Sequence, residues 1–287
     1  MCRLYTACLR KINCVTASVI SASSSFKPAR LSAIVLTLNE SQHIGACLDS
    51  LAWADDRLVF DSYSTDGTVE LAQAHGARVI QHVFHNYAQQ RNAALAQAKN
   101  EFAWVFFVDA DERCTPTLAE EIRAVLADPQ STVYAVPRHN YLFGKLTLGA
   151  GWFPDYQARL FQVGQAGFDP TREVHETAVF AGEIGHLQSP LIHHNYHDVA
   201  QFHRKQRKYT EYDASILFKQ GIRPKPRNFV LQPLREFRRR FISLGGYRDG
   251  WHGLRLSTWM AYYNLDMYRR LARMWRVADG SQSPKVI

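Results

Sequence analysis

The sequence predicts an α/β protein with a mostly parallel sheet and helices on both faces of that sheet. From residue 31, short apolar runs alternate with segments of helical periodicity, which is typical of parallel strands joined by helices. After residue 131 the alternation gives way to short strand-like runs divided by Gly and Pro, which predict an antiparallel extension. From about residue 198 the pattern is helical, basic and aromatic. We therefore expect a helical C-terminal region after the sheet.

Four strands and four helices are expected in the first half. Thr115 is placed to cap the fourth helix with Pro116 at its first position, and Gly76 suits the left-handed position after the second helix. The expected strands span residues 31–38, 57–62, 77–82 and 102–109, and the expected helices span residues 41–52, 66–76, 87–99 and 115–128.

The second half contains weaker strand signals and a marked helix break. Short strand-like runs cover residues 131–139, 158–163 and 173–180. The segment GIRPKPRNF (221–229) contains two prolines and predicts an interruption between helices. We expect one domain over residues 30–200 and a helical, basic region over residues 201–287.

Composition describes a folded chain with a substantial core, because 46% of its residues are hydrophobic and 21% are charged. No run approaches the roughly 18 apolar residues that a membrane-spanning helix needs, so we expect a protein that is soluble or lies on a surface. Its five cysteines form no CxxC pair, which favours a reducing compartment. Residues 1–29 are basic, Ser-rich and free of acids; a signal peptide is one interpretation, and we favour a disordered extension.

The charge is unevenly divided along the chain. Residues 1–200 carry 15 Lys and Arg against 20 Asp and Glu, a balance of −5, whereas residues 201–287 carry 19 against 6, a balance of +13. The C-terminal third is therefore expected to face an anionic partner, either a membrane surface or a nucleic acid.

Polar and acidic residues follow three of the four predicted strands. Ligands of open α/β sheets bind at the carboxyl ends of the parallel strands, so these residues predict a binding site. Helix capping is the alternative, but capping does not require carboxylates after every strand. The residues are Thr37, Asn39 and Glu40 where the first strand ends, Asp61, Ser62 and Asp66 where the second ends, and Asp109 and Asp111 where the fourth ends.

Asp109 and Asp111 are two residues apart in VDAD, and in extended chain they would point the same way. Two carboxylates facing one spot suit magnesium or manganese shared with a phosphate. The chain has no GxxxxGK[ST] loop, so a metal would have to balance the phosphate charge. Glu112 faces the other way, and we assign it to the structure of the turn.

Four segments occur in an order and spacing that resemble the family-two glycosyltransferases with the GT-A fold: IVLTLNES, VFDSYSTDGT, QRNAAL and WVFFVDADE. REVHETAV (172–179), LIHHNYHDVAQFHRKQRKYTEYDA (191–214) and the C-terminal YRDGWHGLRLSTWMAYYNLDMYRRL are similar to the bacterial branch that includes the lipopolysaccharide core β-1,4-glucosyltransferase. The sequence departs from the family at Tyr63, where Gly is common.

The resemblance implies roles for the residues at the strand ends. Asp61 would accept a hydrogen bond from uracil, Arg91 would lie near the nucleotide, and Asp109 would meet sugar and ribose hydroxyls. Asp111 would bind the metal on the diphosphate. The first-strand loop would line the nucleotide pocket through Thr37, Asn39 and Glu40. For Arg91 the alternative is a helix-surface residue, and for Asp61 it is a turn residue bonded to its own backbone.

An inverting transfer needs a base that takes the proton of the acceptor hydroxyl while a metal stabilises the departing diphosphate. Glu176 is our choice for this base, with Glu173 second. In a strand these two face opposite ways, so only one can point into the site. The alternative is that Glu176 pairs with Arg172 or with a lysine of the 204–208 cluster.

His193 and the helix after it are also candidates. His193 matches the family's H-x-x-Y position before Tyr196, and its imidazole could complete the metal shell or bond the diphosphate. His194 cannot face the same metal from an adjacent strand position. Lys205 and Tyr209, one helical turn apart, could close over the diphosphate, although a solvated basic face explains them equally well.

These patterns predict an inverting, metal-dependent glycosyltransferase. It would use manganese or magnesium to transfer a hexose, with glucose from UDP-glucose favoured, to a lipid-linked acceptor such as a lipopolysaccharide core sugar. From residue 234 onward, arginines are interspersed with Trp, Tyr and Leu, which is typical of helices that lie in a membrane interface. Ordinary packing of an amphipathic helix on the domain would explain half of this segment. We therefore expect a peripheral protein on the cytoplasmic face of the inner membrane. The alternatives are a polyprenyl phosphate acceptor and a nucleic-acid-binding protein. Against the latter, the chain has no zinc-finger spacing and no RNA-binding aromatic signature, and its first 200 residues are net acidic, so no nucleic acid is expected.

Overall fold

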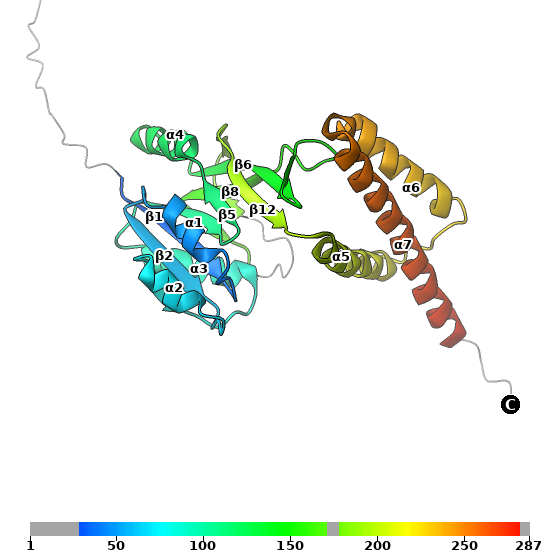
Figure 1. Cartoon of the computed structure of the whole chain (residues 1–287). Coiled ribbons are helices and arrows are strands. Elements are labelled where there is room, and N and C mark those ends of the chain that lie inside the picture. The colour runs from blue at the N-terminus through cyan, green and yellow to red at the C-terminus, as the bar shows by residue number, and fades with distance from the viewer. Residues whose placement is uncertain (1–28, 171–177, 282–287) are drawn as a thin grey trace, which may run out of the picture.

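The computed structural model describes residues 29–170 and 178–281, in which a ten-stranded sheet forms the centre of the N-terminal part (Figure 1). A separate two-stranded sheet consists of β9 (Ala166–Phe168) and β10 (Ala178–Phe180). The strands of the large sheet are β1 (Leu31–Thr37), β2 (Asp56–Asp61), β3 (Arg78–Gln81), β4 (Trp104–Asp109), β5 (Glu112–Cys114), β6 (Val133–Leu142), β7 (Lys145–Thr147), β8 (Tyr156–Gln162), β11 (Gly185–His186) and β12 (Leu191–Tyr196).

The large sheet joins a parallel half to an antiparallel extension. Its path runs β3-β2-β1-β4-β8-β6-β12-β5, and the first four strands are all parallel to one another. Strand β8 runs antiparallel to both β4 and β6 and thereby connects the two halves. The predicted mostly parallel sheet and its antiparallel extension are confirmed.

Helices cover both faces of the parallel half, as predicted. The pattern of β4 explains why: Trp104, Phe106 and Val108 enter one hydrophobic cluster, while Val105 and Phe107 enter the other. The first cluster includes residues of α1 (Ile44–Ser50), α2 (Thr68–Ala74) and α4 (Pro116–Ala127), and the second includes residues of α3 (Tyr87–Ala98). Strand β4 is therefore buried on both of its faces, which accounts for its continuous apolar sequence.

Local sequence signals behave as expected at the ends of the helices. The Thr115 hydroxyl accepts a hydrogen bond from the amide of Leu118 at 3.2 Å and caps α4, with Pro116 at the first helical position. Gly76 follows α2 with φ of 74°. Tyr63 also has positive φ, 61°, so it occupies a conformation that Gly adopts without cost and that costs another residue roughly 1–2 kcal/mol.

The strand ending in VDAD differs from the sequence expectation. Strand β4 ends at Asp109, and the chain turns at Ala110 and Asp111 before it continues as β5. Strand β5 pairs antiparallel with β12, which places His193 opposite Glu112. The spacing argument for Asp109 and Asp111 was therefore wrong in its geometry, since a turn separates them.

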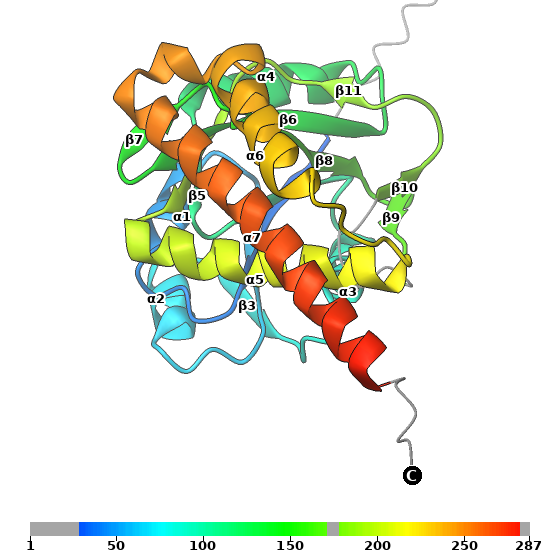
Figure 2. The ribbon, with the colours of Figure 1, turned by 90° about the vertical axis from the view of Figure 1, so that its right-hand side faces the viewer.

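The last third forms three packed helices beside the sheet, which we call the helical layer. It comprises α5 (Val199–Lys219), α6 (Asn228–Arg238) and α7 (Trp251–Ser281), and α7 packs against both others (Figure 2). A π-helical turn (Arg239–Ser243) and a 3-10 turn (Gly246–Asp249) join α6 to α7. The break predicted for residues 221–229 is confirmed by the gap between α5 and α6.

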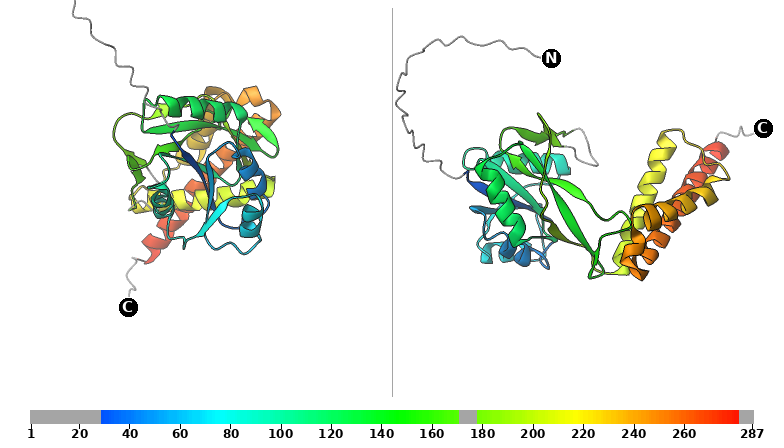
Figure 3. Two further views of the ribbon diagram at one scale, coloured as in Figure 1. Left: turned by 90° about the vertical axis from the view of Figure 1, so that its left-hand side faces the viewer. Right: turned by 90° about the horizontal axis from the view of Figure 1, so that it is seen from above.

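The helical layer joins the sheet through a small hydrophobic cluster and extends away from the parallel half, as the view from above shows (Figure 3). Leu142 and Tyr196, at the ends of β6 and β12, pack there against Phe202 of α5 and Leu256 of α7. Among the described helices, none is both long and apolar enough to cross a membrane.

Candidate active site

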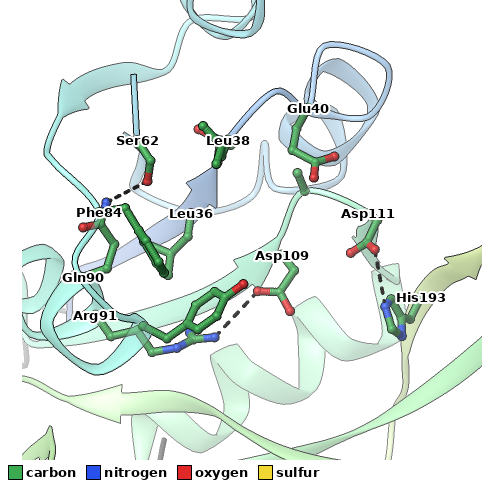
Figure 4. Close-up of a pocket in the computed structure, with 13 residues that line it drawn as sticks. Leu36, Leu38, Glu40, Ser62, Phe84, Gln90, Arg91, Asp109, Asp111 and His193 are labelled. Carbon is green, nitrogen blue, oxygen red and sulfur yellow. Dashed lines mark hydrogen bonds and ion pairs between the residues drawn. The ribbon is translucent and has the colours of Figure 1, made fainter. Parts of the chain in front are cut away.

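A cavity of about 490 Å³ lies at the carboxyl ends of β1, β2 and β4, with α3 and β12 at its sides (Figure 4). The chain positions it there because parallel strands end at one edge of the sheet and leave their following loops free to line a pocket. Seven of the residues predicted from the sequence line this cavity, namely Thr37, Glu40, Ser62, Arg91, Asp109, Asp111 and His193.

Asp109 is held by a buried arginine of the antiparallel half. Arg159 of β8 is 3% exposed and donates to Asp109 and, at 2.6 Å, to Glu112. Burial alone would raise the pKa of Asp109, but the charges of Arg159 and Arg91 outweigh burial and hold that pKa well below its usual range. Asp109 is therefore an ionised carboxylate with one side facing the cavity.

Glu112 stabilises the turn after β4, as predicted. Its carboxylate is fully buried, accepts the amide of Asp109 at 3.0 Å, and lies 3.4 Å from a guanidinium nitrogen of Arg138. It therefore ties the turn after β4 to β6 and β8 and does not line the cavity.

Arg91 reaches the cavity from α3. Its guanidinium lies 3.7 Å from Asp109 and is centred 5.1 Å from the Phe107 ring and 5.6 Å from the Phe168 ring. With 7% of the residue exposed, the alternative of a helix-surface arginine is wrong. The arrangement presents a positive group at the wall of the cavity, next to an ionised carboxylate.

Asp111 faces His193, and the orientation of that imidazole is fixed from behind. The Nε2 atom of His193 lies 3.5 Å from Asp111, and its Nδ1 atom lies 2.7 Å from Oδ1 of Asn140. The amide nitrogen of Asn140 donates to Trp152 O at 2.8 Å and to Asp155 at 3.0 Å, so its oxygen must face His193. The imidazole therefore donates from Nδ1, and in its neutral form the lone pair is on Nε2, towards Asp111.

The Asp111 carboxylate and the His193 imidazole fit a divalent metal ion. Both are ordinary ligands of manganese, and an ion that also binds a diphosphate needs only one or two protein ligands. Within residues 29–170 and 178–281, no cluster of three or more His, Cys, Asp or Glu side chains forms a complete cage. Burial raises the pKa of Asp111, but the hydrogen bond and the positive charge that His193 supplies when its imidazole is protonated at both nitrogens outweigh burial and keep that pKa below its usual value.

Two residues that were predicted to bind the nucleotide instead hold the loops beside the cavity in place. Asp61 is fully buried, and its oxygens accept bonds from Thr37, Gln81 and both the amide and the hydroxyl of Ser64. Its bond with the amide of Ser64 is the local turn contact that the alternative described. Asn39 accepts the amide of Thr65 at 2.9 Å. Neither side chain lines the cavity.

Glu40 is the carboxyl group of the cavity whose pKa is raised, whereas the pKa values of Asp109 and Asp111 are lowered. Burial, followed by the negative charge of Asp111, raises this pKa from 4.5 to about 7. A folded-state pKa above the unfolded value means that the folded protein binds the proton more tightly, so stability falls as pH rises from 4.5 through 7. Glu40 therefore opposes folding at neutral pH when the cavity contains no cation.

We expect Glu40→Gln to raise the melting temperature at pH 8 and to leave it unchanged at pH 4.5. Glutamine keeps the shape but has no charge, so the variant should lose the fall in stability between these pH values. Thermal unfolding of the metal-free protein, followed by circular dichroism across that range, measures the difference. Glu70→Gln, at an exposed position on α2, serves as the control. An equal gain at pH 4.5 would show that the charge is not the cause.

The two predicted residues of α5 do not line the cavity. Lys205 of α5 is half-buried with its Nζ 5.1 Å from the centre of the Tyr196 ring, and its charge acts on Glu40 and Asp111. Tyr209 is exposed one turn further along α5. Glu173 and Glu176 lie outside the described residues.

Sequence reasoning missed several residues of the site. Arg159 and Asn140 become partners of Asp109 and His193 only through pairing between distant strands, for which the sequence has no local signal. Phe84 and Tyr87 also line the cavity, with ring centres 5.0 Å apart, although both are substantially exposed. The available signal was that both aromatic residues lie close to the carboxyl end of the predicted strand 77–82, Phe84 in the following loop and Tyr87 at the start of the predicted helix 87–99.

Comparisons with known proteins agree on one family. A family model described as "Glycosyl transferase family 2" matches residues 32–205. The chain is 30% identical to the lipopolysaccharide core biosynthesis glycosyltransferase LpsC of Rhizobium meliloti, over 78% of this chain and 84% of that protein. It is 27% identical to an uncharacterized glycosyltransferase of Rickettsia bellii, over 89% of this chain and 92% of that protein.

Solved structures show weaker similarity. The glucosyl-3-phosphoglycerate synthase of Mycobacterium tuberculosis, in complex with Mn²⁺, UDP and glucosyl-3-phosphoglycerate, has a TM-score of 0.34 and 25% identity over 39% of this chain and 44% of that chain. S. aureus TarS 1-349 has a TM-score of 0.45 and 18% identity over 87% of this chain and 92% of that chain. The family assignment rests on the sequence matches.

Proposed function

This chain belongs to glycosyl transferase family 2, and on that premise we propose that it transfers a hexose from a UDP-sugar, with glucose favoured, to a lipid-linked acceptor. The acceptor would be a hydroxyl of a saccharide such as lipopolysaccharide core, and the transfer would invert the anomeric centre. The observation that carries the proposal is the cavity in which Asp109, Arg91, Asp111 and His193 meet at the carboxyl ends of the parallel strands.

Asp111 and His193 would hold a divalent metal ion, manganese or magnesium. When bound there, the metal neutralises the charge that develops on the diphosphate leaving group. Asp109, kept ionised by Arg159, would accept hydrogen bonds from sugar or ribose hydroxyls. Arg91 would orient the nucleotide, and Lys205 and Tyr209 would approach the diphosphate from α5.

The base of the nucleotide would lie near Thr37, Glu40 and Ser62. The four hydrogen bonds that Asp61 accepts use about all the lone pairs of a carboxylate, so a uracil N–H would have to replace one of them. The exposed rings of Phe84 and Tyr87 offer a second means of recognition by stacking. Asn39 would act by holding the loop that follows β1.

The proton of the acceptor hydroxyl needs a base, and Glu176 is proposed for this role from the sequence alone, because it lies outside the described residues. The division into a nucleotide-sugar domain (30–200) and a basic helical region (201–287) is also a proposal. In it, the enzyme would work as a peripheral protein on the cytoplasmic face of the inner membrane, where anionic lipid attracts the basic region.

We expect Asn140→Ala to weaken manganese binding by about 10- to 100-fold, as is usual for loss of a residue that orients a metal-binding imidazole. Titration with Mn²⁺ in the presence of UDP measures the affinity, and ¹⁵N NMR of the metal-free protein reports which nitrogen of His193 carries the proton. Asn195→Ala is the control, because its amide is 3.4 Å from the same oxygen and makes a weaker contact. An unchanged tautomer in Asn140→Ala would refute the positioning role.

The function is tested by incubating the protein and Mn²⁺ with a panel of UDP-, GDP- and dTDP-sugars and measuring nucleotide release. We expect release from a UDP-hexose, abolished by a chelator of divalent metals and accelerated by a saccharide acceptor. Release from a GDP- or dTDP-sugar alone would contradict the proposed donor. Faster release with a polyprenyl phosphate than with a saccharide would favour the alternative acceptor.

A further inference from the structure

The outward side of α6 is exposed along its whole length. Val230, Leu231 and Leu234 are 67%, 50% and 62% exposed, and no described residue of this helix is buried. Six exposed residues, which we call the α6 face, lie within an arc of about 140° at 100° per residue. They are Arg227, Val230, Leu231, Leu234, Arg235 and Arg238.

The opposite side of α6 accounts for its packing. The Phe229 ring lies 6.4 Å from the Tyr268 ring of α7, and Glu236 pairs with Arg239 and Arg240 on the turn that follows. Figures 2 and 3 show α6 at the outside of the helical layer, on the far side of α7 from the parallel sheet. The α6 face is thus not a packing surface of the described chain.

The charge of this surface has one sign. Between residues 221 and 252 the only acids are Glu236 and Asp249, and the Asp249 carboxylate accepts the amides of Leu148 and Gly149. Among the described residues, Arg227, Arg235 and Arg238 form no ion pair with a carboxylate. Three guanidinium groups therefore stand beside three aliphatic side chains and face solvent.

Exposed apolar groups continue at the corner where α6 meets α7. Ile242 and Tyr247 are more than half exposed, and Trp251, the first residue of α7, is 78% exposed. An aromatic side chain at the end of an amphipathic basic helix suits the headgroup region of a bilayer.

We propose that the α6 face docks on an anionic lipid surface, with Val230, Leu231 and Leu234 inserted at the headgroup boundary and the three arginines on lipid phosphates. This inference rests on the proposed function, because lipid binding would bring the enzyme to its lipid-linked acceptor. It adds to that function the helix that would bind the lipid surface. A second copy of the chain fits less well, because a two-fold contact would set the same arginines against one another. A nucleic acid would use the arginines and leave the aliphatic side chains without a partner.

The test is flotation with vesicles of phosphatidylcholine alone and of phosphatidylcholine mixed with phosphatidylglycerol. We expect the protein to float with the anionic vesicles only. The pair Val230→Asp/Leu234→Asp and the pair Arg235→Glu/Arg238→Glu should each weaken partitioning by at least about tenfold, since each arginine near such a surface is worth roughly fivefold. Both should keep the wild-type melting temperature, because the four side chains are exposed.

Matched controls come from surface positions outside the helical layer. Leu71→Asp/Val179→Asp replaces exposed apolar side chains of α2 and β10, and Lys99→Glu/Lys145→Glu reverses exposed charges at the end of α3 and on β7; both should float like the wild type. Unchanged flotation of the α6 variants, or equal flotation with neutral vesicles, would overturn the proposal. So would a wild-type dimer in solution that the α6 variants convert to a monomer. Nucleotide release in the absence of lipid tests catalysis separately. A failed flotation test therefore contradicts lipid docking alone, and a failed nucleotide-release test contradicts the proposed function alone.

Discussion

Asp111→Ala is expected to lower sugar transfer by about 100- to 1,000-fold while the fold remains intact. The reason is that Asp111 and His193 are 3.5 Å apart in the cavity and together supply the proposed metal ligands, and a metal at a diphosphate is worth several kcal/mol in the transition state. Initial rates of UDP release, with Mn²⁺ affinity measured in parallel, test the expectation. Circular dichroism checks the fold.

The matched control is Asp128→Ala, which removes an exposed carboxylate at the end of α4. This variant should retain wild-type rates and metal affinity. If Asp111→Ala were fully active, the metal assignment would be wrong. If its rate fell with Mn²⁺ affinity unchanged, Asp111 would act on the substrate and not through the metal.

Arg159→Met should lower the free energy of unfolding by about 3–5 kcal/mol, the usual result of removing one member of a buried ion pair. Methionine fills a similar volume but leaves the buried Glu112 with only the 3.4 Å contact to Arg138, and it removes the principal charge beside Asp109. Urea unfolding at pH 7, with the transition followed by tryptophan fluorescence, measures the difference.

An exposed arginine provides the comparison. Arg223 pairs with Asp279 at 2.8 Å, but both side chains are at least half exposed, so Arg223→Met should lower the free energy of unfolding far less than Arg159→Met does. The added change Glu112→Gln should recover part of the loss in Arg159→Met, because it removes the uncompensated buried charge. Equal effects at residues 159 and 223 would mean that the buried network does not stabilise the fold.

The parallel half of the fold was predictable because its signals are local. The apolar run of β4, the Thr115 cap and Gly76 each depend on neighbouring residues, and the structure confirms all three. Strand β5 was not predictable, because three residues that pair with β12 nearly eighty positions later have no pattern of their own. Missing that strand produced the wrong geometry for Asp109 and Asp111.

The residues of the candidate site also divide into those that local sequence signals predict and those that depend on pairing between distant strands. Thr37, Asp109 and Asp111 follow strands, so their place at one edge followed from the order of elements alone. Arg159 reaches Asp109 from a strand fifty residues away, and Asn140 reaches His193 across fifty-three. Such contacts depend on the pairing of β8 with β4 and of β12 with β6, which local periodicity does not encode.

The four hydrogen bonds that hold Asp61 have a consequence for donor binding. They join the end of β1, the end of β2 and the loop after it into one unit before any ligand arrives. This edge of the cavity is thus preorganised, and little conformational entropy would be lost there on binding of the proposed donor. The proposed nucleotide moiety would then meet groups that are already in place in the free enzyme. The entropy cost of ordering the chain would fall mainly on the residues that bind the sugar and the acceptor.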